Sequence, residues 1–263
     1  MSVYRKSRSN APAGFFECEA KGLLWLKQAE SLGGPHVANV IGWEDDYLDI
    51  DQIDAVSPDV ESAYEFGRQL ARMHDSGAES FGAAPAGYSG TCYFGPLQDP
   101  VPMATGAWDN AVQYFAEGRL VPMVRMGIER GILTAADLRM TNRLIERIPE
   151  ILGNASQDKP ARIHGDLWSG NVMWTSDESG KTHAVLIDPA AHGGHREEDL
   201  AMLELFGSPY MKETIDGYLS VHPLKEGYER RFRFWQLYPI AGHCVFFAGS
   251  YVNQFRTTVD SYL

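Results

Sequence analysis

Apolar side chains recur at helical spacing through most of the chain. In Phe15–Ser31 the residues Phe16, Ala20, Leu23 and Leu24 fall on one face of a predicted helix. Comparable patterns predict further helices over Pro58–Ser76, Trp108–Arg130, Thr134–Leu152, Glu197–Leu205, Tyr210–Val221 and Tyr228–Val252. Thr134 and Asp137 form a capping-box pattern at the start of one of them.

Short apolar runs of strand character lie between these helices. They occupy Val3–Lys6, Val37–Gly42, Tyr47–Ile53, Ala161–Ile163, Val172–Thr175 and Ala184–Ile187. The first three flank the first helix in the order strand, helix, strand, strand, and the rest of the chain is mostly helical. The pattern predicts an α+β fold in two lobes, with a small N-lobe of residues 1–56, a large mostly α C-lobe of residues 57–263, and a boundary near 54–58.

One polar segment, IHGDLWSGNVMW at Ile163–Trp174, interrupts this pattern, and LIDP comes after it at 186–189. Asp166 is expected on a tight loop, and Asn171 is expected to open the strand Val172–Thr175. The following strand, Ala184–Ile187, then places Asp188 at its end. A phosphoryl-transfer site of the protein-kinase type needs these three groups. One carboxylate accepts the proton of the attacking hydroxyl, while an amide oxygen and a second carboxylate hold metal ions against the phosphates.

Each part of this pattern is weak evidence by itself, because HGD is short and an Asp after a strand is usually a turn residue. The complete spacing is much less common by chance, so we interpret it as a kinase-type site. His192 and His195, with Glu197, resemble a zinc-binding pattern. The two glycines between the histidines favour a turn fixed by hydrogen bonds instead.

Composition and charge exclude several other classes. The 263 residues are 44% hydrophobic and 22% charged, which is an ordinary globular composition. The formal net charge of −12 argues against a nucleic-acid binder, because that function needs a basic face. Cys18, Cys92 and Cys244 form neither a disulfide framework nor a zinc spacing. With no long apolar run and a polar start, we expect a cytoplasmic protein that does not bind membranes.

Several segments resemble the fructosamine kinase family, which shares a protein-kinase-like fold with aminoglycoside and choline kinases. The most specific are HGDLWSGN and IDPAAHGGHREEDLAMLELFG, and FFECEAKGLLWL, FGPLQ and YFAEGRL extend the resemblance over nearly the whole chain. The resemblance implies a two-lobed kinase-like fold that binds ATP and Mg²⁺.

The resemblance also implies a role for individual residues. Asp166 corresponds to the base that accepts the sugar hydroxyl proton, and Asn171 and Asp188 to the magnesium ligands. Lys6 corresponds to the lysine that contacts the α- and β-phosphates, and Glu19 to the helix acid that pairs with it. The segment of Asp49, Gln52 and Ile53 corresponds to the hinge that offers backbone groups to adenine.

The pairing of Lys6 with Glu19 agrees with physical expectation, because a glutamate on the next helix fixes the position of an ammonium on a strand. Arg5 and Glu17 are the neighbours most easily mistaken for this pair. Glu17 lies nearly half a helical turn from Glu19, so it is expected to face elsewhere.

The resemblance has one departure. Family members carry a strand–turn–strand over the ATP phosphates before this lysine, whereas here only five residues precede Lys6. Either the N-lobe is trimmed or the start of the chain has been lost, and a trimmed N-lobe is expected to leave the triphosphate more exposed. The expected consequence is a high KM for ATP, and a value in the low micromolar range would contradict it.

Further residues are candidates for the acceptor pocket and for its support. Trp168, beside Asp166, is a candidate to contact the substrate, although core packing explains it equally well. Trp108 is a second candidate, although aromatic residues on helical stretches belong to the core by default. The Gly- and Pro-rich stretch Phe81–Pro102 is too long for a plain connection and is expected to be functional. His164 and Asp199 are expected to support the loop that carries the base.

The sequence thus predicts an ATP-dependent kinase, and the resemblance implies that it phosphorylates the third-carbon hydroxyl of a ketosamine, on a free amino acid or on a glycated protein lysine. Two alternatives stay open. One is a kinase for another hydroxyl compound, such as an aminoglycoside or choline. The other is a catalytically weak, nucleotide-binding pseudokinase. The oligomeric state is not indicated by the sequence.

Overall fold

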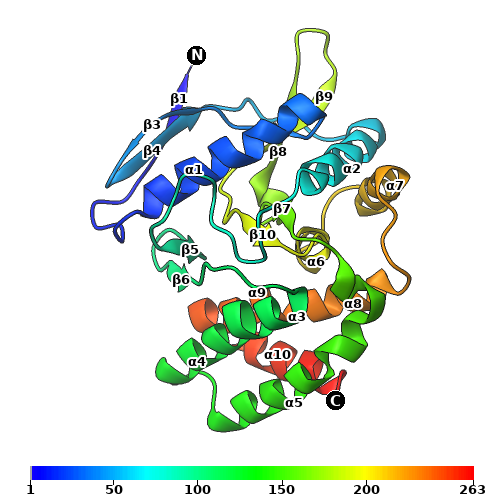
Figure 1. Ribbon diagram of the computed structural model, residues 1–263. Coiled ribbons are helices and arrows are strands. Elements are labelled where there is room, and N and C mark those ends of the chain that lie inside the picture. The colour runs from blue at the N-terminus through cyan, green and yellow to red at the C-terminus, as the bar shows by residue number, and fades with distance from the viewer. Residues whose placement is uncertain (1) are drawn as a thin grey trace.

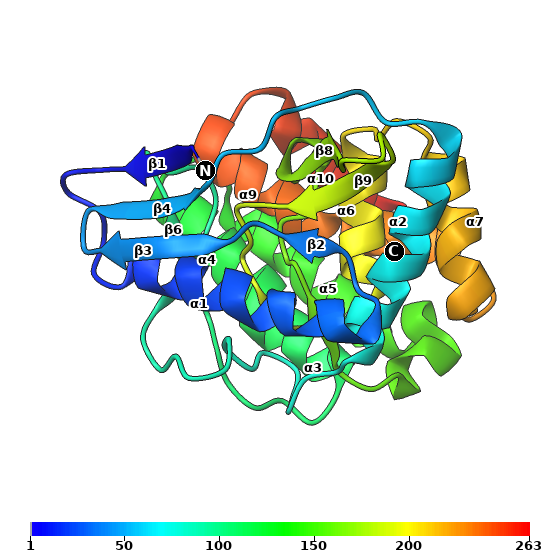
Figure 2. The same ribbon diagram turned by 90° about the horizontal axis from the view of Figure 1, so that it is seen from above.

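The structure is a computed structural model that describes residues 2–263. Its smaller part is an antiparallel sheet covered by one helix (Figure 1). The strands β1 (Val3–Ser7), β4 (Tyr47–Asp51) and β3 (Val40–Glu44) are hydrogen-bonded in that order. Helix α1 (Phe15–Lys27) lies along this sheet, as the view from above shows (Figure 2).

Alternation of buried and exposed positions explains how α1 joins the sheet. On β4, Leu48 and Ile50 are buried while their neighbours are partly exposed, as expected for a strand with one face toward a core. Phe16 and Leu23 on α1 are also buried and belong to the same hydrophobic core. Three residues of the predicted face, Phe16, Ala20 and Leu23, therefore pack into the core, whereas the fourth, Leu24, is 38% exposed and the prediction is wrong for it.

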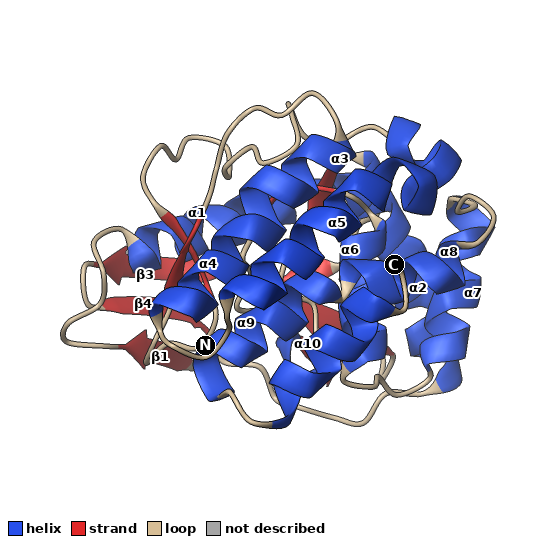
Figure 3. Ribbon diagram, turned by 90° about the horizontal axis from the view of Figure 1, so that it is seen from below, coloured by secondary structure: helices blue, strands red, loops and turns tan. Residues whose placement is uncertain are grey.

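The larger part consists mostly of helices (Figure 3). Its helices are α2 (Val60–Asp75), α3 (Ala111–Gln113), α4 (Val121–Glu129), α5 (Ala135–Leu152), α6 (Glu197–Leu205), α7 (Met211–Val221), α8 (Tyr228–Trp235), α9 (Leu237–Phe247) and α10 (Ser250–Asp260). The predicted capping box is confirmed, since the side chains of Thr134 and Asp137 bond each other's backbone N–H. Over residues 2–263, no helix is long and apolar enough to cross a membrane.

Two small sheets lie where the two parts meet. Strand β2 (His36–Val37) pairs in parallel with β9 (Thr182–Leu186), and β9 pairs antiparallel with β8 (Val172–Ser176). Strand β7 (Ala161–Ile163) pairs with β10 (His192–Gly194). The strand β2 belongs to the N-lobe predicted from the sequence, so its pairing with β9 ties that region to the larger part.

Two sequence predictions of single elements are wrong. The predicted strand Val37–Gly42 is split between β2 and β3, which belong to different sheets. The predicted helix Tyr228–Val252 is instead divided among α8, α9 and α10. Ala248 and Gly249 adopt positive φ angles of 53° and 61°, which end α9 before α10 begins. An apolar periodicity alone does not show such a break.

Other elements differ in detail. The predicted helix Trp108–Arg130 contains a π-helix at Tyr114–Leu120 between α3 and α4, and it begins only after Trp108. The stretch Phe81–Pro102 is not a plain loop, since it contributes β5 (Cys92–Phe94) to a hairpin with β6 (Val101–Met103).

Candidate active site

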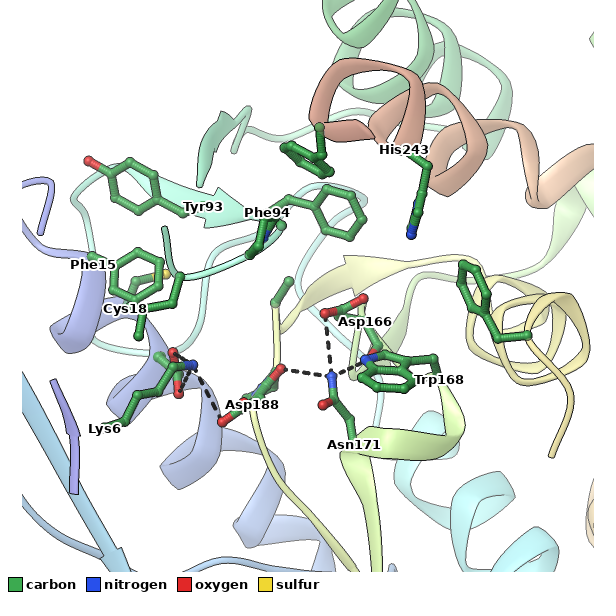
Figure 4. A pocket seen from close by; sticks show the side chains of 18 of the residues that line it. Lys6, Phe15, Cys18, Tyr93, Phe94, Asp166, Trp168, Asn171, Asp188 and His243 are labelled. Carbon is green, nitrogen blue, oxygen red and sulfur yellow. Dashed lines mark hydrogen bonds and ion pairs between the residues drawn. The ribbon is translucent and has the colours of Figure 1, made fainter. Parts of the chain in front are cut away.

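A cavity of about 470 Å³ lies between the two parts and collects the chemically active groups predicted from the sequence. At one end it is lined by Lys6, Glu19, Asp166, Asn171 and Asp188. At the other end it is lined mainly by aromatic side chains, namely Trp168, Phe206, His243, Phe246, Phe247 and Tyr251. In the view of Figure 4, Asp166 lies between Lys6 and Asp188 on one side and Trp168 and His243 on the other.

The β8–β9 hairpin brings two of these groups together. Val172 is paired with Leu186, so the residues just outside the hairpin, Asn171 and Ile187, face each other. The backbone N–H of Ile187 donates to the carbonyl oxygen of Asn171 at 3.1 Å. Asp188 is the next residue, so the register of the hairpin places Asn171 and Asp188 at the same edge, as the sequence predicted.

His164 ties the loop of Asp166 to this edge. Its Nε2 lies 2.8 Å from the carbonyl oxygen of Ile187, and its Nδ1 accepts the backbone N–H of Asp166 at 3.2 Å. Because a carbonyl oxygen only accepts, Nε2 carries the proton and the ring is neutral. Burial lowers the pKa of His164, which favours the same state. The ring of His164 thus links the loop that carries Asp166 to the end of the strand that precedes Asp188.

Asp199, from α6, fixes the other side of the same loop. Its carboxylate accepts the backbone N–H groups of His164 at 2.8 Å and Gly165 at 2.9 Å. The same carboxylate lies 3.1 Å from Nε2 of buried His74. Burial disfavours the charge of Asp199, but His74, His164 and the backbone donors lower its pKa overall. The contact expected from the sequence is therefore present.

The neighbours of Asp166 determine its hydrogen bonds and its pKa. The amide nitrogen of Asn171 donates to the backbone oxygen of Asp166 at 2.8 Å and to its Oδ2 at 3.3 Å. Burial, together with the nearby carboxylate of Asp188, raises the pKa of Asp166 to about 7. A carboxyl group with this pKa is well matched to receive a proton near neutral pH.

Lys6 on β1 meets two carboxylates. Its Nζ lies 3.0 and 2.8 Å from the two oxygens of Glu19 and 3.4 Å from Oδ1 of Asp188. Burial alone lowers the pKa of Lys6, but the two carboxylates raise it above its ordinary value, so the side chain stays an ammonium. Glu17 is exposed, as its helical spacing from Glu19 predicted. Arg5 pairs with Asp49.

Asn171 and Asp188 have the chemistry of a site for a hard cation. The Asn171 nitrogen is used by Asp166, which leaves its amide oxygen available as a ligand. Asp188 has a positive φ of 51°, a conformation that few residues other than glycine adopt, and it keeps a partly exposed carboxylate at the cavity. Oxygen donors of these two kinds suit Mg²⁺.

The two tryptophans predicted from the sequence have different positions. Trp168 lines the cavity, is 42% exposed and packs over Gly170, where a Cβ would lie 2.1 Å from the ring. Trp108 does not line this cavity. It packs against Gly82 and Gly118, and its ring nitrogen donates to Glu117 at 3.3 Å. The expectation that Trp108 contacts the acceptor therefore has no support from its position.

The residues that correspond to the adenine hinge also lie outside this cavity. The carboxylate of Asp49 is bound by the guanidinium of Arg5 at 2.7 and 2.6 Å. The backbone N–H of Gln52 donates to the oxygen of Ser2 at 3.0 Å. Gln52 and Ile53 line a separate hollow of about 310 Å³ with β2 and β9. The structure does not bring these three residues to the Asp166 cavity.

His192 and His195 both have hydrogen-bond partners within the protein. His192 lies 2.7 Å from the oxygen of Ala190 and 2.7 Å from the hydroxyl of Tyr114. His195 Nε2 lies 3.2 Å from the oxygen of Ala155. The glycines between the histidines belong to strand β10, so the predicted turn is wrong at this point. Their small size lets Gly193 approach the backbone of Ser80.

Sequence reasoning missed most of the aromatic end of the cavity. His243, Phe246 and Phe247 lie on α9 and Tyr251 on α10, so they were treated only as part of one long helix. Arg119 does not line this cavity. It is fully buried, donates to the backbone oxygens of Ala104 and Gly118, and lies over the ring of Tyr114.

Comparison with known proteins agrees with this geometry. The family model described as fructosamine kinase matches residues 1–263. A probable ketoamine kinase from Vibrio parahaemolyticus is 32% identical over 252 residues, which cover 93% of this chain and 79% of the relative.

Solved structures give the same result for the fold. A putative fructosamine-3-kinase from Thermobifida fusca has a TM-score of 0.87 and 41% identity, over 99% of this chain and 85% of that one. The aminoglycoside phosphotransferase APH(2")-IIa, solved with streptomycin and ATP, has a TM-score of 0.63 and 14% identity, over 98% and 84% of the two chains. The second likeness supports only the protein-kinase-like fold. With a family match along its whole length, the chain belongs to the fructosamine kinase family.

Proposed function

We propose that this protein transfers the γ-phosphoryl group of ATP to a sugar hydroxyl of a ketosamine, of the fructosamine or ribulosamine type. Three lines of support combine: membership in the family, the 41% identical putative fructosamine-3-kinase, and the groups gathered at one end of the cavity. The observation that carries the proposal is the position of Asp166. It lies in the cavity between the charged groups and the aromatic groups (Figure 4).

The chemistry needs one base and a set of groups that hold the phosphates. The oxygen of the acceptor hydroxyl attacks the γ-phosphorus as the bond between that phosphorus and the β,γ-bridging oxygen breaks, and ADP leaves. Asp166 receives the hydroxyl proton. Its pKa of about 7 lets it take up this proton without holding it too strongly for release.

Lys6 is proposed to contact the α- and β-phosphates, in an orientation fixed by Glu19. The amide oxygen of Asn171 and the carboxylate of Asp188 would hold Mg²⁺, which supplies neutralisation of phosphate charge when it is bound. The backbone around Asp49, Gln52 and Ile53 remains the proposed place for adenine. Support for this last part comes only from the resemblance.

The test measures ADP release with ATP and Mg²⁺ over a panel of acceptors: fructosyl-lysine, ribulosyl-lysine, an aminoglycoside, choline and free sugars. Asp166→Asn is measured beside the wild type, with nucleotide binding followed by calorimetry. Turnover of a ketosamine that is lost in Asp166→Asn, with ATP binding retained, is the expected result. Turnover only of another acceptor would keep the mechanism and reject the substrate.

The alternative of a pseudokinase is tested by the same measurements. A module that only binds nucleotide has no need of a base, and Asp166, Asn171 and Asp188 are all present at one cavity. Binding of ATP without turnover of any acceptor would favour this alternative. If ketosamines are substrates, a comparison of fructosyl-lysine with a glycated protein shows whether protein lysines are also accepted, and so whether the enzyme acts in deglycation.

A further inference from the structure

The aromatic end of the cavity contains an unusual group of exposed rings. Among residues 2–263, the phenylalanine and tryptophan side chains that are exposed to solvent are Trp168, Phe206 and Phe247, and all three line this cavity. Phe247 is 57% exposed. Large apolar side chains that stay exposed at one place are expected to contact a ligand or partner.

These rings are arranged around a histidine. The ring centroid of His243 lies 5.0 Å from that of Phe206, 5.3 Å from Phe247 and 4.9 Å from Tyr251. The four residues come from α9, α10 and the end of α6, so three separate segments build one cluster. We call Phe206, His243, Phe247 and Tyr251 the aromatic cluster.

The hydrogen bonds of His243 leave one nitrogen free for a ligand. Its Nδ1 lies 2.7 Å from the carbonyl oxygen of Pro239, so Nδ1 carries the proton. Burial lowers the pKa of His243, which favours the neutral ring. In a neutral ring Nε2 can only accept a hydrogen bond. Figure 4 shows the ring of His243 directed into the cavity above Asp166 and Trp168.

The charged side chains of the cavity indicate whether a positively or a negatively charged ligand group fits it. The charged side chains that line it are Lys6, Glu19, Asp166 and Asp188, which are one cation and three acids. Lys6 is already bound by two of these carboxylates. The aromatic cluster contains no lysine or arginine, so it has no positively charged side chain to pair with an anion. Aromatic faces and an accepting nitrogen instead suit a cation that donates hydrogen bonds.

We propose that the aromatic cluster binds the protonated amine of the acceptor, with the amine N–H donating to Nε2 of His243 and the rings contacting the amine and the chain attached to it. This inference rests on the proposed function, and it adds which part of the acceptor is recognised and by which residues. In a ketosamine the amine and the third-carbon hydroxyl are separated by four bonds, a span on the order of 5 Å. The aromatic cluster and Asp166 line the same cavity, as an acceptor that contacts both requires.

The test compares fructosyl-lysine with the same compound acetylated on the nitrogen that carries the sugar. Acetylation removes both the positive charge and the N–H of that nitrogen and adds an acetyl group, so the cluster variants described below are measured with both acceptors. For the wild type, the charged acceptor is expected to have a kcat/KM at least about tenfold higher. Equal values for the two acceptors would overturn the proposal. Absence of turnover with any ketosamine would overturn the proposed function itself, so the two failures are distinct.

Variants of Phe247 and His243 assign the effect to the cluster. Phe247→Leu keeps an apolar side chain and removes the ring, and Phe247→Trp keeps a ring. Phe247→Leu is expected to raise the KM for fructosyl-lysine by about three- to tenfold, with little effect on kcat, while Phe247→Trp does not. His243→Phe is expected to raise the KM for fructosyl-lysine by a similar factor. His243→Gln keeps a hydrogen-bond acceptor and is expected to raise this KM less. Equal losses for the charged and acetylated acceptors would show ordinary apolar contact and overturn the proposal.

Discussion

The carboxylate of Asp199 accepts the backbone N–H of His164 at 2.8 Å, which connects α6 to the loop that carries Asp166. A second bond, from the N–H of Gly165, makes this contact a two-point attachment. Gly165 has a positive φ of 80°, and a Cβ there would lie 2.3 Å from the oxygen of Ala190. The loop is therefore held by a buried acid on one side and by close backbone packing on the other.

Asp199→Asn is expected to lower kcat by about 10- to 100-fold, because one acceptor oxygen becomes a donor that opposes a backbone N–H and shifts the base. The free energy of unfolding is expected to fall by about 2 kcal/mol. The matched control is Asp177→Asn in the exposed β8–β9 turn, where Asp177 also accepts two backbone N–H groups. Steady-state kinetics and urea unfolding measure both effects. An equal kcat in the two variants would contradict the positioning role.

The pair of Lys6 and Glu19 is expected to act on the nucleotide. Glu19→Gln removes a buried carboxylate that holds the ammonium at 2.8 Å. We expect kcat/KM for ATP to fall by about 30-fold or more, the low end for loss of one member of a buried charge pair. Glu17→Gln, two residues earlier and exposed, is the control and is expected to leave this value unchanged. A similar loss in both variants would show an effect of net charge instead.

The core of the candidate site could be predicted because its groups are close in sequence or lie on regular elements. Asp166, Asn171 and Asp188 belong to one loop and one hairpin, so their spacing already limits their distance. Lys6 and Glu19 lie on a strand and a helix whose inward faces can be read from apolar periodicity.

The aromatic end could not be predicted in this way. His243 and Phe247 lie on α9, and Tyr251 follows on α10 after a break at Ala248, where a positive φ occurs that no sequence pattern indicates. Trp108 shows the reverse error, because this large aromatic residue was expected to contact the acceptor but packs against Gly82 and does not line the cavity. Tertiary packing, which decides both cases, is not visible in local spacing.

Gly95 lines the cavity and packs closely against Phe246, which also lines it. It has a φ of 102°, and a Cβ there would lie 2.2 Å from the ring of Phe246. Gly95→Ala is therefore expected to lower the free energy of unfolding by about 3 kcal/mol, and to raise the acceptor KM by displacing Phe246. Gly180→Ala is the control, because Gly180 has a φ of 82° with open space around it. It is expected to cost about 1 kcal/mol and leave KM unchanged. Thermal unfolding measures the change in stability of both variants, and steady-state kinetics measure the change in the acceptor KM.

Asp137 provides a test of stability against pH. The guanidinium of Arg256, at 2.6 and 2.9 Å, and the Thr134 cap lower the pKa of Asp137 to about 2 from its usual 3.8. A lowered pKa in the folded state contributes stability above the usual pKa, and this contribution is lost as the pH falls from about 4 toward 2.

Asp137→Asn is accordingly expected to lower the free energy of unfolding by about 1 to 2 kcal/mol at pH 7, a value reduced for the partial exposure of Arg256. The difference from the wild type should shrink as the pH approaches 3, because the wild-type acid then loses its charge advantage. Urea unfolding at several pH values measures it. The control Glu150→Gln breaks an exposed pair with Arg147 and is expected to change stability by less than about 0.5 kcal/mol. A difference for Asp137→Asn that stays constant with pH would show that the ion pair contributes nothing measurable.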